Sequence, residues 1–163
     1  MKLVKSSASF TRPSDTTQYA QNDLVANSTT AGSVVPMPFF LPSQGLKIWR
    51  VALFKTSTTI TNAAFRLHLY ADSPTVANGD NGALSTSTSR YQGFIDIAAA
   101  AVANTDDYLA HGVYVNNSVF APMYLVADKD RRIYGLLQNT AATGYIPASA
   151  EGFTVTLLGE SYA

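Results

Sequence analysis

The stretch Phe65-Arg66-Leu67-His68-Leu69-Tyr70-Ala71 decides the fold class, because apolar residues recur in it at every second position. Successive side chains of an extended strand point to opposite faces, so this period turns one set of residues toward a core and the other set outward. A polar connection rich in Gly, Asn and Asp follows from Asp72 to Arg90, and a second strand-like run covers Tyr91 to Ile97. This part of the chain therefore predicts half-buried strands and not helices.

Runs of β-branched and aromatic residues, separated by turn formers, predict eight or nine strands in the whole chain. The runs are Val4 to Phe10, Leu24 to Ala26, Val34 to Phe40, Leu46 to Thr56, Ala64 to Ala71, Tyr91 to Ile97, Met123 to Ala127, Ile133 to Gln138 and Phe153 to Leu158. Many short strands with long, irregular connections favour an all-β fold, a jelly-roll-like antiparallel β-sandwich. We expect residues 1–163 to form this single domain, with residues 1–12 as a candidate N-terminal arm.

Two local patterns give further structural predictions for the first half of the chain. Prolines interrupt Val34 to Leu41, and because proline donates no ladder hydrogen bond, this segment is expected on a sheet edge or as an extended arm. Trp49 breaks the alternation within Leu46 to Phe54. That break predicts either a strand buried on both faces or a β-bulge that re-aims the side chains.

Two more patterns concern the second half of the chain. The charged run Asp128 to Arg132 separates two strand-like runs, so the simplest prediction is a β-hairpin with a charged tip. The alanine-rich segment Ile97 to Val102 is the one candidate for helix, but its length allows a single turn or an irregular loop.

Charge and composition exclude several classes of protein. Eleven basic and eleven acidic residues give a formal net charge of zero, which argues against a nucleic-acid binder that relies on counterion release. The chain contains no cysteine, so disulfides and thiolate metal sites are excluded. It shows no secretory signal and no window of membrane-spanning length, so we expect a soluble protein made in the cytoplasm. Charged residues make up only 13% of the chain, which favours a surface covered by neighbouring proteins.

The residues that could support catalysis are few and scattered. His68 occupies an outward position of an alternating strand, so a surface or interface role is expected for it, and His111 beside Gly112 is expected in a loop. The segment Asp72 to Gly82 holds oxygen donors and glycines but lacks the spacing of a calcium loop. The pair Asp106-Asp107 is expected in a turn or at a helix cap. We therefore predict no catalytic, cofactor-binding or metal-binding residue.

Several phrases of the sequence resemble small structural proteins encoded in the head-gene regions of tailed bacteriophages. These phrases are Ser7 to Ala20, Asp23 to Ser28, Phe65 to Tyr70, Ser73 to Thr75 and Asn78 to Gly82. The relatives are similar to head-decoration, or cement, proteins. The resemblance implies a jelly-roll β-fold that sits as an oligomer on the outside of the capsid and clamps neighbouring major capsid subunits. It assigns no binding residue by position.

These observations together predict a non-enzymatic virion protein, made in the host cytoplasm, that binds the outer surface of the assembled head. Its expected partners are the major capsid protein and further copies of itself in a dimer or trimer, with no direct contact to nucleic acid or membrane. The residues expected at the interface are Val34, Val35, Met37, Phe39, Phe40, Phe10 and Arg12.

The alternative is a glycan-binding or structural β-sandwich of a phage tail or head fibre, in which exposed aromatic rings stack on sugars. An enzyme is the third hypothesis and requires a pocket with convergent carboxylates.

Overall fold

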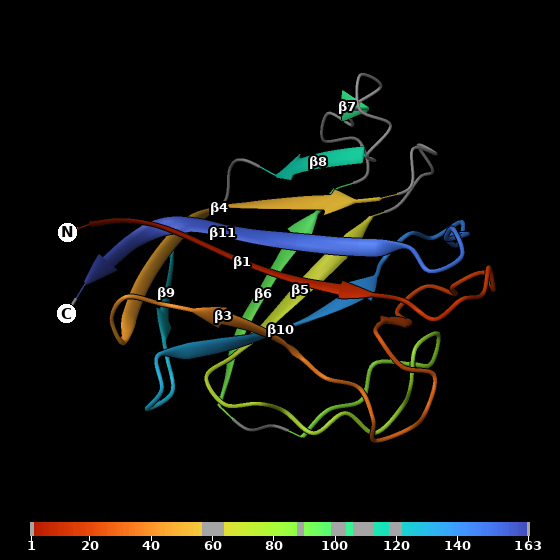
Figure 1. The fold of residues 1–163 in the computed structure, drawn as a ribbon, viewed down its shortest axis with the longest axis horizontal. Helices are drawn as coiled ribbons and strands as arrows, with labels where there is room; N and C mark the ends of the chain where they lie inside the picture. Colours follow the sequence, from red (N-terminus) through yellow and green to blue (C-terminus); the bar gives the residue numbers. More distant parts are fainter. Residues whose placement is uncertain are drawn as a thin grey trace.

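A computed structural model of the chain describes residues 2–56, 64–87, 90–98, 104–105, 113–117 and 122–162. The described residues form eleven strands and no helix (Figure 1). One sheet has six strands, in the order β1 (Lys2–Thr11), β11 (Gly152–Tyr162), β4 (Gly45–Lys55), β8 (Val113–Asn117) and β7 (Asn104–Thr105), with β9 (Met123–Val126) also paired to β4. The other has five, in the order β2 (Leu24–Val25), β10 (Arg132–Asn139), β5 (Phe65–Tyr70) and β6 (Tyr91–Ile97), with β3 (Met37–Phe40) also paired to β10. The predicted all-β sandwich is confirmed.

The two sheets pair strands that lie far apart in the sequence, and every strand pair in them is antiparallel. Strand β1 pairs along its whole length with β11, and β3 pairs with β10. On the outer face the hydroxyls of Ser7 and Thr156 lie 2.8 Å apart and form a hydrogen bond across the first of these pairs. As a result both termini lie at one end of the molecule, at the left in Figure 1. We refer to this as the terminal end.

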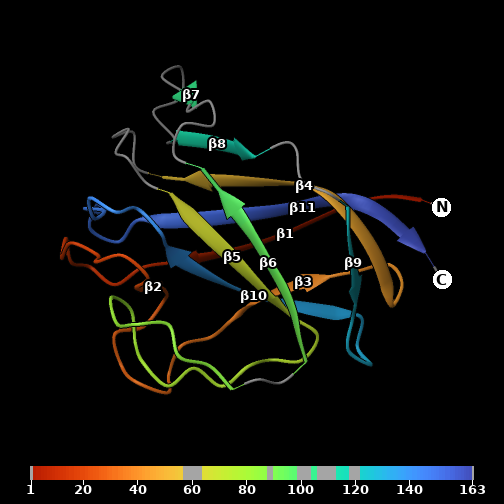
Figure 2. The same cartoon turned by 180° about the vertical axis from the view of Figure 1, so that it is seen from behind.

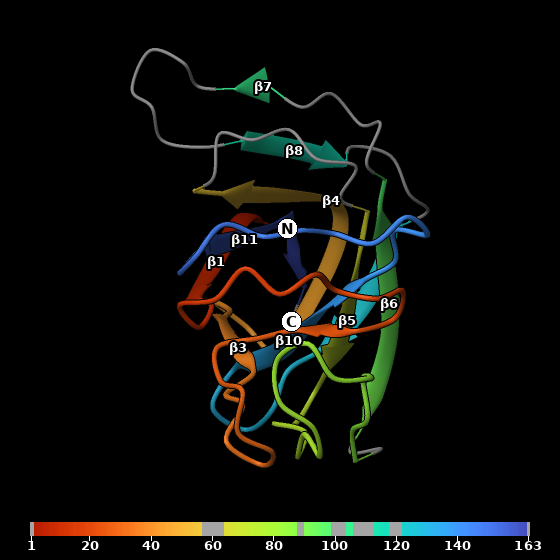
Figure 3. The ribbon, with the colours of Figure 1, turned by 90° about the vertical axis from the view of Figure 1, so that its right-hand side faces the viewer.

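The core lies between the sheets and is built from the alternating residues of both. In β5 the apolar residues Phe65, Leu67 and Leu69 are fully buried, while Arg66 and His68 between them are partly exposed. The same period in β11 buries its apolar residues against those of β5. The alternation predicted from this stretch is therefore confirmed. Figure 3 views the sandwich from the end opposite the termini.

Trp49 lies at a β-bulge in β4. Arg50 pairs with Leu158 and Ile48 pairs with Gly159, so Trp49 is the extra residue between two consecutive positions of β11. A bulge opposes two residues on one strand to one on the other and so shifts the side-chain alternation. Gly159 is required opposite it, because a Cβ atom there would lie 2.1 Å from the carbonyl oxygen of Lys47. Of the two alternatives for Trp49, the structure shows the bulge.

The predicted hairpin around Asp128 to Arg132 is wrong. Strand β9 pairs with β4 in the six-stranded sheet, whereas β10 pairs with β5, β3 and β2 in the five-stranded sheet. The turn between them carries the chain from one sheet to the other, and the Asp128 carboxylate stabilises it by accepting hydrogen bonds from the backbone N–H groups of Asp130 and Arg132. The apolar residues Leu125 and Ile133 thereby face the core from opposite sheets.

Three other predictions concern the ends and the edge of the sheets. Residues 2–11, for which an N-terminal arm was a candidate, form the edge strand β1. The proline-containing segment Val34 to Leu41 contains β3, which among the described strands has β10 as its one partner, so its edge position is confirmed. The helical candidate Ile97 to Val102 lies outside the described residues from position 99 onward.

The connection between β5 and β6 packs against the outer face of the five-stranded sheet (Figure 2). Val76 and Leu84 of this loop belong to one apolar cluster with Tyr70 and Leu136, which point outward from β5 and β10. Val76 and Thr86 form an isolated antiparallel bridge, and the Ala77 N–H donates to the Ser85 carbonyl at 2.9 Å. The loop therefore covers part of the outer face of the five-stranded sheet and stands beside the uncovered part. We call this loop the loop wall.

Candidate functional site

The residues predicted to contact a partner do not form one surface. The structure buries Arg12, Val34, Met37 and Phe39, half-buries Phe10, and exposes Val35 and Phe40. Burial in the isolated chain leaves Phe39 and Met37 unable to contact a partner without unfolding β3. Val35 and Phe40 are the two of the predicted interface residues that are exposed, and for these two an interface role stays a prediction.

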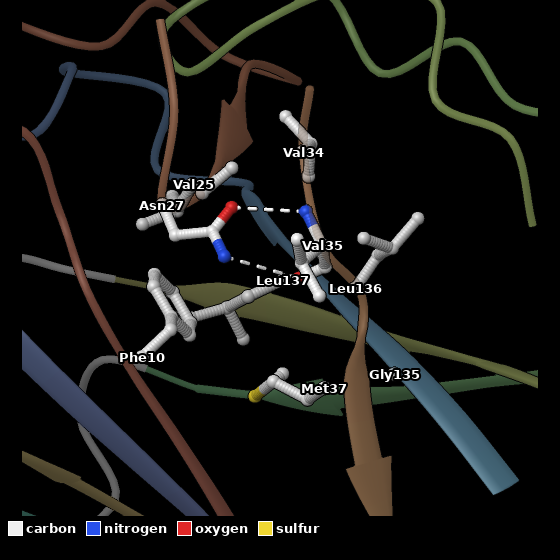
Figure 4. A pocket seen from close by; sticks show the side chains of 10 residues that line it. Phe10, Val25, Asn27, Val34, Val35, Met37, Gly135, Leu136 and Leu137 are labelled. Atoms are coloured by element: carbon white, nitrogen blue, oxygen red, sulfur yellow. Dashed lines mark hydrogen bonds between the residues drawn. The ribbon is translucent and has the colours of Figure 1, made fainter. Parts of the chain in front are cut away.

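The close-up in Figure 4 shows how the segment before β3 is held against the sandwich. The Val35 N–H donates to Asn27 Oδ1 at 3.0 Å, and Asn27 Nδ2 donates to the Val35 carbonyl at 3.4 Å, so one side-chain amide pairs with the backbone as a neighbouring strand would. The hollow beneath, lined in part by Phe10 and Met37, has a volume of about 10 Å³. That is room for about one water molecule, so this segment closes the core of its own chain.

Arg12 lies in the interior and forms a buried ion pair. Its Nη2 atom lies 2.9 Å from Asp80 Oδ2, and both side chains are fully buried. Asp80 Oδ1 also accepts hydrogen bonds from the Tyr19 hydroxyl at 2.6 Å and from the Ala26 N–H at 2.7 Å. Burial raises the pKa of Tyr19 above its usual value, and its hydrogen bond to Asp80 adds to the shift. Within the Asp72 to Gly82 segment, the carboxylate of Asp80 is thus paired with a guanidinium.

A second buried ion pair lies beside the first. Lys55 Nζ lies 3.3 Å from Glu151 Oε1, and the Tyr145 hydroxyl donates to the other carboxylate oxygen. Burial lowers the pKa of Lys55. The rings of Tyr19 and Tyr145 stack with centroids 5.9 Å apart, which joins the two pairs into one network. Because all four charged side chains are at most 2% exposed, the network stabilises the fold and offers no access to a substrate.

Exposed apolar side chains gather at the terminal end of the sandwich. We call the group of Leu3, Tyr124, Val126 and Tyr162, on the outer face of the six-stranded sheet, the terminal surface. The first three are exposed, and the Tyr162 ring packs edge-on against Tyr124 with centroids 5.8 Å apart. Gly45 makes this possible, since a Cβ atom there would lie 2.6 Å from the Tyr162 ring. Phe40 is also exposed, but it pairs with Arg132 of β10 and faces outward from the five-stranded sheet.

The terminal surface continues along the outer face of the six-stranded sheet. Register places Leu3, Glu160, Lys47 and Tyr124 side by side on four neighbouring strands. Farther along the same face lies a hollow of about 400 Å³. It is lined by Lys5, Ser7, Arg50, Phe54, Thr154, Thr156 and Leu158. The face therefore combines apolar side chains with three basic groups, Lys5, Lys47 and Arg50, against the carboxylate of Glu160.

A different surface lies on the outer face of the five-stranded sheet, beside the loop wall. It is a hollow of about 260 Å³ lined by His68, Tyr70, Leu84, Thr86 and Tyr91, and we call it the aromatic groove. Strands β5 and β6 supply the floor and one side, and the loop between them supplies the other side.

A β-bulge orients the rings of the aromatic groove. The register between β5 and β6 shifts at Gly93, whose φ of +127° is one that L residues rarely adopt. Positions three apart on a regular strand face opposite sides, but this shift leaves both Tyr91 and Phe94 on the outer face. The two rings flank His68, with centroids 5.9 and 6.1 Å from the imidazole.

Hydrogen bonds connect the histidine of the groove to the backbone. Gln138 Nε2 donates to the Asn22 carbonyl at 3.0 Å, which leaves Gln138 Oε1 as the acceptor for His68 Nε2 at 3.0 Å. His68 Nδ1 lies 3.1 Å from the Tyr91 hydroxyl. Burial lowers the pKa of His68 below its ordinary value of 6.5, so the imidazole is neutral at neutral pH. Because Gln138 Oε1 can only accept a hydrogen bond, the neutral His68 ring carries its proton on Nε2. His68 Nδ1 is then an acceptor, and the Tyr91 hydroxyl donates a hydrogen bond to it.

The described residues give no sign of a metal centre or a membrane span. Across the described ranges no three His, Cys, Asp or Glu side chains converge in a way that would hold a metal ion. The same ranges hold no helix with the length and hydropathy that crossing a bilayer requires. His111 and Asp106-Asp107 lie outside the described residues.

Comparison of the chain with protein-family models and with curated proteins finds no match. The sequence placed His68 and Tyr70 on an outward face but missed Tyr91 as their neighbour. The signal that was present is Gly93 within the run Tyr91 to Ile97, since a glycine inside a strand marks a bulge.

Proposed function

We propose that the protein is a head-decoration protein of a tailed bacteriophage, which binds the outside of the assembled capsid and stabilises the junctions between major capsid subunits. In this role it sits on the virion surface as a dimer or trimer and catalyses no reaction. A protein that binds the assembled shell and not its dissociated subunits stabilises the shell by mass action. The resemblance of the sequence to such proteins motivates the proposal, and two features of the structure support it.

The first supporting feature is the order of the strands. Pairing of β1 with β11 and of β3 with β10 wraps the early part of the chain around the late part. The order β1-β11-β4-β8 in one sheet and β10-β5-β6 in the other, with β3 also paired to β10, supports the jelly-roll arrangement that we propose for this sandwich. Such a fold presents broad sheet faces and edges for contact.

The second feature, which carries the proposal, is the terminal surface together with the outer face of the six-stranded sheet. A stable protein interface takes about 800 Å² from each partner and has an apolar, aromatic centre with a polar rim. The terminal surface supplies such a centre, with Tyr124 and Tyr162 as its rings. The basic groups on the adjoining sheet face predict that the contacted capsid surface is acidic.

The test is co-sedimentation of the purified protein with expanded phage heads that lack a decoration protein. We expect saturable binding at a stoichiometry set by the symmetry of the head, with heads that resist higher temperature. A Leu3→Ser, Tyr124→Ser double variant removes two exposed apolar side chains from the terminal surface, and we expect it to lower the affinity at least 10-fold.

The matched control is Ile146→Ser at the opposite end of the sandwich. Ile146 is 58% exposed and Tyr124 is 63% exposed, so the control also removes a well-exposed apolar side chain. The control is expected to bind heads like the unmodified protein. If the folded protein fails to bind heads, the decoration role is wrong, and if both variants bind equally well, the terminal surface is not the contact.

A further inference from the structure

The aromatic groove has the features of a ligand site that the capsid-binding role does not require. Tyr91 and Phe94 are 45% and 44% exposed, although each ring has a neighbouring aromatic group to pack on. The ring of Tyr70 forms part of the floor, 5.1 Å from that of Tyr91. Sites for small molecules combine such apolar walls with a few placed polar groups. The volume of about 260 Å³ lies below the 300–1,000 Å³ typical for drug-sized ligands, which limits the occupant to about one ring.

The hydrogen-bonding groups of the groove select the chemistry of that ring. Because Tyr91 donates its only proton to His68, its oxygen faces the groove with acceptor sites available. Tyr70 and Thr86 share one hydrogen bond of 3.1 Å, so this pair of hydroxyls retains one O–H to donate. The occupant must therefore be able both to donate and to accept. A sugar hydroxyl does both.

The charges around the groove favour an uncharged ligand. Arg66 and Asp96 flank it as a two-bond ion pair with distances of 2.6 and 3.0 Å, and the guanidinium also covers one face of Phe94 at 3.9 Å. Arg90, next to Tyr91, lies 3.5 Å from Asp72. Each cation beside the groove thus has a carboxylate partner, and no net field attracts a phosphate or an ammonium group.

The wall of the groove is held in place from the interior. The loop that carries Leu84 and Thr86 is fastened by the buried Asp80, which Arg12, Tyr19 and the Ala26 N–H all bind. Gly79 adds a close approach, since a Cβ atom there would lie 2.1 Å from the Thr29 carbonyl oxygen. A site whose walls are already ordered loses less entropy when a ligand binds.

We propose that the aromatic groove binds one pyranose ring of a neutral glycan. The ring stacks on the exposed face of Tyr91, one of its hydroxyls donates to the Tyr91 oxygen, and another accepts from the Tyr70 and Thr86 pair. A proline-rich peptide is the competing occupant of an aromatic surface. Its prolyl carbonyls only accept hydrogen bonds, so they leave the Tyr91 oxygen without a partner, and an extended peptide needs a longer trough than this one-ring hollow.

The experiment is a titration of the ¹⁵N-labelled protein with glucose, galactose, N-acetylglucosamine and maltose, followed by NMR. At least one sugar is expected to shift the backbone signals of His68, Thr86 and Tyr91 with a dissociation constant on the order of 1 mM, as suits a ligand that contacts one ring. A Tyr91→Ala variant is expected to lose this binding. Tyr91→Phe keeps the ring and removes the hydroxyl, so we expect it to weaken binding about 10-fold while the fold stays intact.

The matched control is Tyr124→Ala, which removes an exposed tyrosine from the other sheet, outside the lining of the groove, and is expected to bind the sugar normally. Decaproline and N-acetylneuraminic acid are titrated in parallel. Shifts at the groove with decaproline alone, or with the acidic sugar alone, would overturn the proposal. So would the absence of groove shifts with every neutral sugar, because the spectrum itself shows that the protein is folded.

Discussion

At the scale of single residues, the buried pair of Arg12 and Asp80 does two things at once. It ties the end of β1 to the loop between β5 and β6, two segments separated by 68 positions in the sequence. It also satisfies a carboxylate that, without the guanidinium, would lie unpaired in the interior. Removing one member of a buried ion pair typically costs about 3–5 kcal/mol, because the other charge stays behind.

We predict that Arg12→Met lowers the free energy of unfolding by about 3–5 kcal/mol. The double variant Arg12→Met, Asp80→Asn removes both charges and keeps an acceptor for the Ala26 N–H, so it is expected to recover part of the loss. Urea denaturation followed by circular dichroism measures both. Lys129→Met, which removes a solvent-exposed ion pair with Asp130, is the control and is expected to leave the midpoint unchanged. A double variant less stable than Arg12→Met would contradict this account.

His68 gives a prediction about pH. Its pKa is lowered in the folded protein by burial, so the unfolded chain binds a proton more readily. The stability associated with the neutral imidazole is therefore complete above about pH 6.5 and is lost as the pH falls from there through the lower pKa of the folded state. His68→Gln has no such proton to bind.

Denaturation curves between pH 5 and 8 test this prediction for the unmodified protein and the His68→Gln variant. The difference between the two free energies cancels the titration of the other groups. It is expected to shift in favour of the variant as the pH is lowered. A difference that stays constant with pH would show that the histidine has the same pKa folded and unfolded.

At the scale of secondary-structure elements, two bulges direct the outward side chains. The bulge at Trp49 shifts the alternation of β4, and the bulge at Gly93 places Tyr91 on the face of His68. Each uses a glycine where a side chain does not fit, Gly159 because of close backbone contact and Gly93 because of its positive φ. The irregular positions of these strands thus set which residues meet on the surface.

Gly93→Ala tests the role of the second bulge. We expect a loss of about 1–3 kcal/mol in the free energy of unfolding, because alanine is strained at a φ of +127°. Sugar binding at the aromatic groove is expected to weaken more than stability alone explains, since Tyr91 moves. Gly32→Ala is the control, with a φ of +75° and no atom near the added Cβ. Equal sugar binding by both folded variants would rule out the bulge as the device that orients Tyr91.

The sequence predicted the elements better than their partners. The period of two in β5 gave the buried face correctly, and Tyr91 to Ile97 matches β6 at both ends. Pairing failed at Asp128 to Arg132, since a charged turn looks the same whether the next strand returns to its own sheet or crosses to the other. Arg12 was expected at an interface for a similar reason, because its partner Asp80 is 68 positions away and only the folded chain brings them together.

At the scale of the whole molecule, β1 is a structural part of the sandwich. It contributes Val4, Ala8 and Phe10 to the core and pairs with β11 over ten positions. Lys2 and Lys5 of this edge strand are exposed, and charged side chains on an edge strand discourage pairing with other chains.

We therefore predict that deletion of residues 2–11 abolishes cooperative folding. The deletion leaves the backbone edge of β11 unpaired, removes Val4, Ala8 and Phe10 from the core, and takes away the strand that leads into Arg12, so the buried network loses its support. Thermal denaturation followed by circular dichroism is the measurement, and no sharp transition is expected. An arm that only contacts a capsid would give the opposite result, a truncated protein that melts like the full chain and binds heads less well.

The pairing of β1 with β11 also has a consequence for synthesis on the ribosome. Ser7 and Thr156, which face each other in the sheet, are 149 residues apart. At about 5–20 residues per second, a nascent chain waits roughly 7–30 s between making the first strand and making its partner. During that time β1 lacks its pairing partner, and neither sheet is complete. The sandwich consequently cannot be completed before β11 has been made, and the crowding of identical nascent chains on one messenger raises the hazard of mispairing.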